Sequence, residues 1–214
     1  MGLHHLEARV EARTRDDFPP VASLMAEVER LRREIAVARA RIGELEARAD
    51  IDPLLDILNR RGFERELKRA LAHVKRYGTH ASLMFIDLDG FKAVNDRHGH
   101  ATGDALLKAL SRQLIARVRA SDIVGRLGGD EFGVVVWRVD EAQASRKARE
   151  LETLIGTVSV MQGQAEVQVG ASIGTAPLLP AAAPAEVIDA ADRAMYARKQ
   201  ERRNQFLPPL SSPV

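Results

Sequence analysis

Four acidic residues stand in two short groups that could hold cations or move protons. Asp87 and Asp89 end an apolar run that begins at Phe85, and Lys92 follows shortly after. Because alternate residues of a strand point to the same side, the two carboxylates are predicted to share one face. Carboxylates at the end of a strand suit a hard cation such as Mg²⁺. The alternative is a buried strand that simply runs out into solvent at these acids.

The second acidic group follows two glycines, in the segment Arg126-Leu127-Gly128-Gly129-Asp130-Glu131-Phe132. Two glycines allow a tight turn whose backbone comes close to a ligand. Surface turns also contain Gly and Asp for conformational reasons alone. If the two acidic groups lie on neighbouring strands, up to four carboxylates meet, and they repel one another unless cations compensate. Two divalent ions would supply that compensation, and a triphosphate bound to the ions fits the same arrangement.

The elements that position these acids follow from apolar periodicity and turn residues. Strands are expected at four places: 82–88, 122–127, 132–139 and 166–175. Helices are also expected at four places: 63–76, 104–117, 141–155 and 185–200. The Gly-Gly turn joins two of the strands in a hairpin. This mixture predicts an α+β fold in which helices cover a sheet, followed by a loose tail at 207–214.

A heptad pattern occupies the N-terminal part of the chain. Apolar residues repeat at alternating spacings of four and three from Leu24 to Ala49. In a parallel dimer, three oppositely charged pairs would face each other across the seam: Glu27–Arg32, Glu34–Arg39 and Arg41–Glu46. A helix packed on its own domain also gives such a stripe, although usually a wider one. We expect a short segment at 1–20, a dimerising coiled-coil helix at 21–51 and a folded domain at 52–206.

The composition limits the classes of function. The chain has 214 residues, of which 45% are hydrophobic, and a net charge of +2. It can therefore bury a core, and it is not expected to bind nucleic acid through bulk charge. The absence of cysteine excludes disulfides, thiolate metal sites and cysteine nucleophiles. No apolar run reaches the roughly 18 residues of a membrane span and no secretory leader is recognisable, so we expect no membrane insertion and a cytoplasmic location.

Two further patterns are interpreted as structural. The segment from Gly170 to Gly174 matches the G-x-S-x-G pattern of hydrolases, but Pro177 follows where a helix would have to start. His98 and His100 have no thiols or further histidines clustered near them in the sequence, and a packed loop is expected there. Neither pattern predicts a catalytic centre.

Residues 128–132 read Gly-Gly-Asp-Glu-Phe, and from about Asp52 to Asn204 the chain resembles the GGDEF family of diguanylate cyclases. Other segments follow in family order and spacing: Asn59-Arg60-Arg61-Gly62-Phe63, Phe91-Lys92-Ala93-Val94-Asn95-Asp96, Gly103-Asp104, Ser172-Ile173-Gly174 and Ala191-Asp192-Arg193-Ala194-Met195-Tyr196. The resemblance implies a five-stranded, mainly antiparallel sheet wrapped by helices, akin to nucleotide cyclases and polymerase palms. It also implies that two domains of a homodimer condense two GTP into cyclic di-GMP and release two pyrophosphates.

The resemblance further implies a metal site. Asp87 and Asp130, with the carbonyl of Leu88, would hold two Mg²⁺ ions in each half-site, or Mn²⁺ in their place. Glu131 would either coordinate a metal or act as a base. Asp130, Glu131, Lys92 and Arg126 are thus the expected catalytic residues.

Nucleotide contacts are implied in the same way. Asn95 and Asp104 would read guanine, because a carboxylate can accept both of its N–H donors. The phosphates would meet four basic side chains and the backbone near an aromatic residue: Lys92, Arg126, Lys199, Arg203 and Phe91.

A regulatory site is implied by Arg119-Ala120-Ser121-Asp122, an RxxD motif just upstream of the Gly-Gly turn. Many family members bind product there for feedback inhibition, and Arg119 could fork onto a guanine edge while Asp122 takes its N–H donors. The alternative is an ion pair at the end of a helix.

The chain also departs from the family pattern. Leu55 and Asp56 stand where Thr and Gly are usual, and Arg198 and Arg202 replace the usual Ala and Gly of the last motif. None of these positions is an expected metal or guanine contact, so an active cyclase is expected. The alternative is a catalytically silent receptor for cyclic di-GMP, or a GTP-sensing dimer. A regulatory protein could bind the N-terminal helix.

Overall fold

The computed structural model describes residues 21–48 and 50–206. The chain divides into two compact units, 1–48 and 49–214, and each is described by itself. The expectations for the short segment at 1–20 and for the tail at 207–214 lie outside the described residues. Among the described helices, none has the length and apolar character that crossing a membrane requires.

The first unit contains one long helix, α2 (Val21–Arg48). Its heptad side chains are exposed, from 44% at Leu31 to 56% at Leu45. Arg30 donates to Glu27 at 2.6 Å and to Glu34 at 3.0 Å, so charged residues pair along the helix surface. The helix thus presents an apolar stripe with charges beside it, as the heptad pattern predicts.

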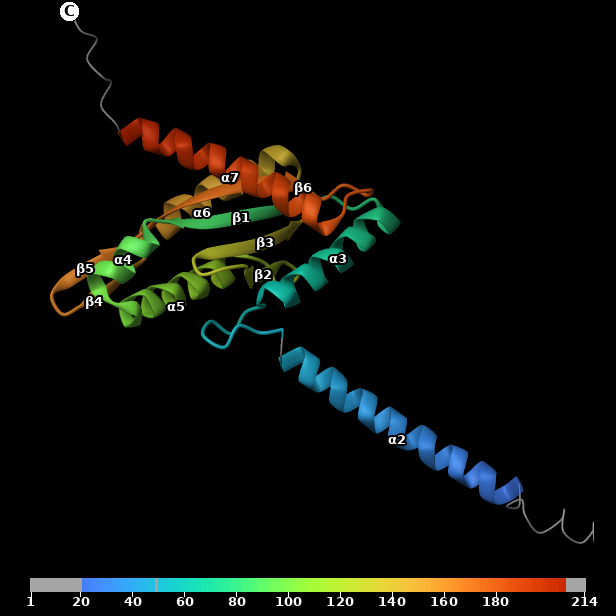
Figure 1. Cartoon of the computed structure of the whole chain (residues 1–214). Helices are drawn as coiled ribbons and strands as arrows, with labels where there is room; N and C mark the ends of the chain where they lie inside the picture. Colours follow the sequence, from blue (N-terminus) through green and yellow to red (C-terminus); the bar gives the residue numbers. More distant parts are fainter. Residues whose placement is uncertain (1–20, 49, 207–214) are drawn as a thin grey trace, which may run out of the picture. The chain divides into compact units, whose positions relative to one another are not determined.

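The second unit is built on a four-stranded antiparallel sheet in the order β2-β3-β1-β6 (Figure 1). The strands are β1 (Ala81–Asp89), β2 (Ile123–Arg126), β3 (Glu131–Trp137) and β6 (Gly170–Pro177). A separate two-stranded hairpin consists of β4 (Ser159–Gln162) and β5 (Ala165–Gln168). The hairpin predicted around the Gly-Gly turn is confirmed as β2 and β3.

The α+β class expected from the sequence is confirmed, but the strand count of the main sheet differs from the five expected. The residues of the β4–β5 hairpin are mostly exposed, and they pair with each other instead of extending the sheet. At the free edge of β2, Leu58 forms an isolated parallel bridge with Gly125 of that strand, but it is not part of a fifth strand. The single strand expected at 166–175 is therefore two strands, because the chain leaves the hairpin at Val169 and joins the sheet at Gly170.

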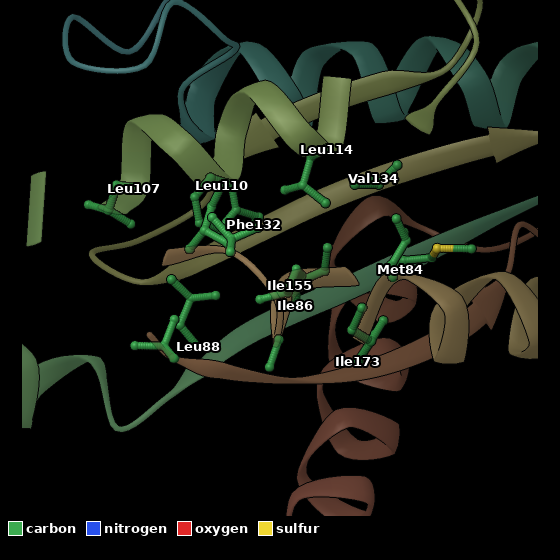
Figure 2. Close-up of a cluster of buried hydrophobic side chains, with 14 of the residues drawn as sticks. Met84, Ile86, Leu88, Leu107, Leu110, Leu114, Phe132, Val134, Ile155 and Ile173 are labelled. Carbon is green, nitrogen blue, oxygen red and sulfur yellow. The ribbon is translucent and has the colours of Figure 1, made fainter. Parts of the chain in front are cut away.

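Helices cover both faces of the sheet (Figure 1). α3 (Arg60–Tyr77) and α7 (Pro184–Phe206) contribute to one core, which includes Phe63, Leu67, Val187 and Met195. α4 (Phe91–His98), α5 (His100–Arg117) and α6 (Glu141–Ile155) contribute to the other. Figure 2 shows this second core, where side chains of β1, β3 and β6 meet those of α5 and α6.

Local signals explain where these helices begin and end. The side chain of Asn59 accepts the Gly62 N–H at the start of α3, and Gly78 ends that helix with a left-handed φ of 65°. Asp140 and Gln143 form a reciprocal capping box at the start of α6, which matches the helix expected at 141–155. The sequence pattern does not predict α4, because its eight residues contain few apolar side chains.

Glycines allow α3 and α7 to approach the sheet closely. Gly125, Gly133 and Gly174 lie in one row across the strands, level with Phe85 of β1. A Cβ at Gly133 would lie 2.5 Å from the ring of Phe63, and one at Gly174 would lie 2.0 Å from the backbone N of Met195. The absence of side chains in this row brings both helices close to the face that carries the acids.

Candidate active site

The two acidic groups predicted from the sequence meet at one end of the sheet. Asp87 of β1 lies directly opposite Glu131 of β3 on one side and opposite Ser172 of β6 on the other. Asp130 comes just before β3, and its carbonyl accepts the N–H of Leu88 at 3.2 Å. Since opposite residues of an antiparallel pair point to the same face, Asp87 and Glu131 share the face covered by α3 and α7.

The carboxylates of this group repel one another. Burial raises the pKa of Asp130, and the charge of Asp87 raises it further, while Lys199 and Arg126 act in the opposite direction. Burial also raises the pKa of Glu131, with added repulsion from Asp130 and Asp87. A half-buried group of acids that ionise reluctantly is stabilised by a cation.

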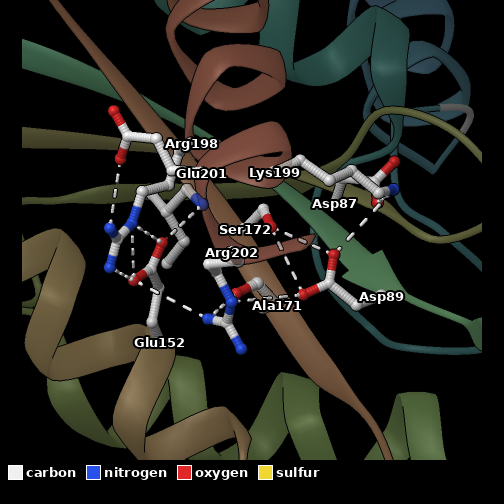
Figure 3. Close-up of polar contacts among 10 residues, drawn as sticks. Asp87, Asp89, Glu152, Ala171, Ser172, Arg198, Lys199, Glu201 and Arg202 are labelled. Carbon is white, nitrogen blue, oxygen red and sulfur yellow. Dashed lines mark hydrogen bonds and ion pairs between the residues drawn. The ribbon is translucent and has the colours of Figure 1, made fainter. Parts of the chain in front are cut away.

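The oxygen donors suit Mg²⁺ or Mn²⁺ in kind, but they are not gathered in coordination geometry. Within residues 21–48 and 50–206, no three histidine or acidic side chains converge closely enough to form a ready-made metal site. The cation that the structure brings to Asp87 is the ammonium group of Lys199, which donates to Oδ1 (Figure 3). Lys199 Nζ also lies 3.9 Å from Asp89 Oδ1.

Asp89 belongs to the same face but has its own partners. It accepts a hydrogen bond from Ser172 Oγ at 3.0 Å, and Arg202 Nε lies 3.8 Å from its other oxygen (Figure 3). Ser172 is fully buried in β6, so it is a partner of a carboxylate within a strand. The interpretation of the G-x-S-x-G match as structural is thereby confirmed.

Arg126 is engaged within the domain. Its Nη1 donates to Asp52 Oδ2 at 3.1 Å, and its Nε and Nη2 donate to the carbonyls of Gly128 and Gly129 at 3.0 and 2.8 Å. Asp52 in turn accepts the N–H groups of Leu54 and Leu55, each at 2.9 Å. In this structure the guanidinium therefore connects the start of the domain to the turn that precedes Asp130.

The residues expected to read guanine lie together on α4 and α5. The Oδ1 atom of Asn95 is buried and has no hydrogen-bond partner. A Cβ at Gly103 would lie 1.9 Å from this atom, so Gly103 makes room for the Asn95 amide. Asp104 follows Gly103 and is exposed. An unpartnered buried oxygen beside an exposed carboxylate is an arrangement that a ligand with N–H donors would satisfy.

Other expected phosphate contacts lie on α4 and α7. Phe91 is buried at the first position of α4, and Lys92 is exposed beside it. Arg203 is exposed on α7, one turn beyond Lys199. Lys199 reaches the acids, whereas Lys92 and Arg203 extend into solvent.

Arg119 and Asp122 lie at the opposite end of the sheet. Asp122 accepts the N–H of Arg119 at 2.9 Å and that of Trp137 at 3.2 Å. Trp137 pairs with Ala81, six residues along β1 from Asp87, which corresponds to about 20 Å. A cavity of ≈ 500 Å³ opens here, lined by His73, Thr79, Arg119, Ser121, Trp137 and Arg138. The motif thus borders a separate cavity, and its carboxylate organises a turn.

The imidazole of His98 contacts a glutamine. His98 Nδ1 lies 2.5 Å from Gln162 Oε1, and Gln162 Nε2 donates to the His98 carbonyl at 2.7 Å. This side chain ties the end of α4 to the β4–β5 hairpin. The packed loop expected at these histidines is wrong, because His98 ends α4 and the exposed His100 begins α5.

Two acidic residues of this region are not identified by the sequence analysis. Asp52 pairs with Arg126, and its only signal is its place at the start of the resembling segment. Glu152 is buried on the inward face of α6, four residues after Ala148. An acid on the apolar face of an amphipathic helix is the signal that could have identified it.

Comparison with known proteins shows the family to which the chain belongs. Residues 49–205 match the family model described as "Diguanylate cyclase, GGDEF domain". Diguanylate cyclase DosC of Escherichia coli (strain K12) is 36% identical over 156 residues, which cover 72% of this chain and 34% of DosC. Diguanylate cyclase TpbB of Pseudomonas aeruginosa is 35% identical over 170 residues, which cover 76% of this chain and 38% of TpbB. The chain thus spans about a third of the length of these relatives.

Solved structures show the same fold. The coiled coil and GGDEF domain of DgcB from Caulobacter crescentus, in complex with c-di-GMP, aligns with a TM-score of 0.71 at 26% identity. That alignment covers 85% of this chain and 97% of the DgcB chain. A sensory box/GGDEF family protein from Caulobacter crescentus CB15 aligns with a TM-score of 0.65 at 35% identity, covering 71% of this chain and 99% of the other. The sequence, the fold and the acidic site agree, and the chain belongs to the GGDEF-domain diguanylate cyclase family.

Proposed function

We propose that the chain is a diguanylate cyclase, which condenses two GTP into cyclic di-GMP and releases two pyrophosphates. The observation that carries this proposal is the group of acids at the end of the sheet. Asp87 of β1 lies opposite Glu131 of the neighbouring strand β3, and Asp130 immediately precedes Glu131 in the chain. Lys199 of α7 contacts Asp87. Acids that need cations, next to a lysine that can meet phosphates, suit a nucleoside triphosphate bound with divalent ions.

The proposed reaction forms one phosphodiester bond at each of two sites. The 3′-hydroxyl of one GTP attacks the α-phosphorus of the other, the bond to the β-phosphate breaks, and pyrophosphate leaves. The hydroxyl proton needs a base, for which Glu131 is the candidate, because burial and the neighbouring carboxylates raise its pKa and so make it a better proton acceptor. Lys199, Lys92, Arg126 and Arg203 would offset the phosphate charge.

We propose that Asp87 and Asp130, with the Leu88 carbonyl, hold Mg²⁺ ions, two per half-site. When bound, the ions would stabilise the charge that develops on the phosphate oxygens. The donor set favours this proposal, since carboxylate and carbonyl oxygens are the ligands of hard cations. In the absence of a metal, Lys199 compensates Asp87, so Lys199 would have to release that carboxylate before an ion could bind there.

Two domains must face each other for this reaction, because each would bind one GTP. We propose a homodimer formed through a parallel coiled coil of α2, which would raise the local concentration of the partner domain. The exposed apolar stripe of α2 supports this proposal. The related DgcB fragment contains a coiled coil and a GGDEF domain. A regulatory protein that binds the N-terminal helix stays a prediction, as does a cytoplasmic location, where GTP is supplied.

We also propose product inhibition through Arg119 and Asp122. The cavity beside Arg119 offers space for a ligand at this position, and the related DgcB fragment forms a complex with c-di-GMP. Arg119 is exposed, so its guanidinium could donate two hydrogen bonds to a guanine edge.

The test of the proposed function is incubation of the chain with GTP and Mg²⁺, followed by chromatography. The expected result is cyclic di-GMP and two equivalents of pyrophosphate, lost on chelation of the metal or in Asp130→Asn. Absence of product at a concentration that saturates the dimer, after removal of bound nucleotide, would reject the cyclase. In that case, tight binding of cyclic di-GMP would favour the silent receptor.

A further inference from the structure

Glu152 is a buried carboxylate that the proposed reaction does not use. Its side chain projects from α6 and is 5% exposed. It accepts the N–H of Ile173 in β6 at 3.0 Å and hydrogen bonds from Arg198 Nη2 at 2.9 Å and Nε at 3.2 Å (Figure 3). Arg202 Nη1 lies 3.7 Å from the same carboxylate. A charge buried to this degree is tolerated because hydrogen bonds and opposite charges surround it.

These contacts also complete the free edge of the sheet. β6 is the last strand on its side, so the outward backbone groups of Ala171 and Ile173 have no neighbouring strand. Glu152 accepts the N–H of Ile173, and Arg202 Nη1 donates to the carbonyl of Ala171 at 2.6 Å. Two side chains from α6 and α7 therefore occupy the place of a further strand, which fixes both helices against β6.

The same network continues to the acidic site. Arg202 lies between Glu152 and Asp89, and Lys199 lies between Asp89 and Asp87 (Figure 3). Arg198 and Arg202 are four residues apart, so they lie on one stripe of α7. Lys199 is the next residue after Arg198, about 100° around the helix. Fixing the arginine stripe on Glu152 consequently fixes the direction in which Lys199 projects.

We propose that Glu152, acting through Arg198 and Arg202, is a positioning residue that directs Lys199 toward the acids and the phosphates of the nucleotide. The proposal rests on the proposed function, in which Lys199 contacts phosphate. It assigns a role to two arginines that stand where the family usually has Ala and Gly. Glu152 touches neither substrate nor metal in this arrangement, and its effect passes through the orientation of α7.

The experiment compares Glu152→Gln with Lys199→Met and with the double variant in the full chain. Gln keeps an acceptor for the Ile173 N–H but removes the charge that holds Arg198. The probe is a GTP analogue with a methylene between the α- and β-phosphorus atoms, with Mg²⁺ present and calorimetry as the measurement. Each single variant is expected to weaken binding about tenfold, and the double variant no more than Lys199→Met alone, because coupled residues are not additive.

A second ligand and a matched control separate positioning from general damage. Guanosine lacks phosphate, so Glu152→Gln should leave its affinity unchanged. Glu150→Gln removes an exposed acid from the same helix and should bind the analogue like the unmodified chain. If Glu152→Gln does not fold, Arg202→Lys serves instead, since lysine keeps the charge but cannot contact Ala171, Asp89 and Glu152 together.

Three outcomes would overturn the proposal. Normal binding of the analogue by a folded Glu152→Gln chain would show that the orientation of Lys199 does not depend on Glu152. Additive losses in the double variant, or an equal loss of guanosine affinity, would show that Glu152 acts by another route. If the unmodified chain and Glu150→Gln both fail to bind the analogue, the proposed function itself is wrong, and the role of Glu152 falls with it.

Discussion

Asp87 and Glu131 occupy directly opposite positions of the β1–β3 ladder, so two carboxylates of like charge share one cross-strand pair. Like charges in this position destabilise an antiparallel sheet. The two groups are half-buried, and Asp130 adds a third negative charge beside them. The domain thus tolerates a local repulsion at the site where substrate and cations are proposed to bind.

Removing one charge should stabilise the chain without metal. Burial raises the pKa of Glu131 above its ordinary 4.5, so its ionisation lowers stability as the pH rises from about that value through the raised pKa. Glutamine at this position cannot ionise, so Glu131→Gln avoids this loss of stability. We expect it to be more stable by about 0.5 kcal/mol at pH 7.5 and to show no gain at pH 3.5, measured by urea unfolding. Glu150→Gln is the control, and a gain that is the same at both pH values would contradict the explanation.

The Lys199–Asp87 contact predicts competition between the lysine and a divalent ion. Lys199→Met leaves Asp87 without its ammonium partner, so the acids should bind Mn²⁺ about fivefold more tightly when no nucleotide is present. Titration followed by electron paramagnetic resonance would measure this affinity. Arg203→Met removes a cation one turn away that lies in solvent, and it should change the affinity little. Weaker Mn²⁺ binding in Lys199→Met would reject the competition.

The charge pattern of α2 predicts the orientation of the dimer. Glu34→Arg would place one arginine opposite Arg39 of the partner helix on each side of the seam and should weaken a parallel dimer about tenfold. Adding Arg39→Glu restores opposite charges and should recover the affinity, although the contact of Glu34 with Arg30 is still lost. Sedimentation equilibrium measures both. An antiparallel dimer would not show the recovery.

The turn before α3 predicts a simple stabilising change. Asp56 has a left-handed φ of 56°, a conformation that costs free energy for a residue with a Cβ. This explains why glycine suits the position in related sequences. Asp56→Gly should stabilise the domain by about 0.5 kcal/mol and Asp56→Val should destabilise it by about 1 kcal/mol, measured by thermal unfolding. Asp189→Gly in the exposed part of α7 should instead destabilise, by about 0.5–1 kcal/mol.

The proposed inhibitory site predicts a selective loss of feedback. Arg119→Ala should leave initial turnover unchanged and raise the concentration of cyclic di-GMP needed for half inhibition at least tenfold. Arg112→Ala, an exposed arginine of α5, is the matched control. Asp122 is a poorer target, because it holds the N–H groups of Arg119 and Trp137, and its loss would also disturb the turn. Unchanged inhibition in Arg119→Ala would refute the site.

The main sheet and the long helices could be predicted because burial leaves a clear record in the sequence. The apolar run of β1 and the stripe of Leu106, Leu110 and Leu114 in α5 are long and regular. The β4–β5 hairpin and α4 are short and mostly exposed, so their residues carry little periodic signal. Strand count depends on which strands pair with each other, and local sequence contains little information about that choice.

The acidic residues of the site could be predicted, but their partners could not. Asp87 stands out as a charge near the end of an apolar strand, and Glu131 stands out because it follows the Gly-Gly turn and begins an apolar strand. The contacts of Arg126 with Asp52, and of Lys199 with Asp87, join residues that are 74 and 112 positions apart in the chain. Such contacts depend on how α7 and the start of the domain pack against the sheet, which no local pattern reveals.

The β2–β3 turn has a consequence for the kinds of mutation that the domain can accept. Its strands are joined by four residues, 127–130, and the N–H of Leu127 donates to the Glu131 carbonyl at 2.8 Å. Adding or deleting one residue between Glu131 and Phe132 would place both side chains on the same face of β3, because side chains alternate along a strand. With Phe132 held in the core of α5 and α6, Glu131 would then point away from Asp87. During evolution, substitutions at this point should thus be far easier to accept than insertions or deletions.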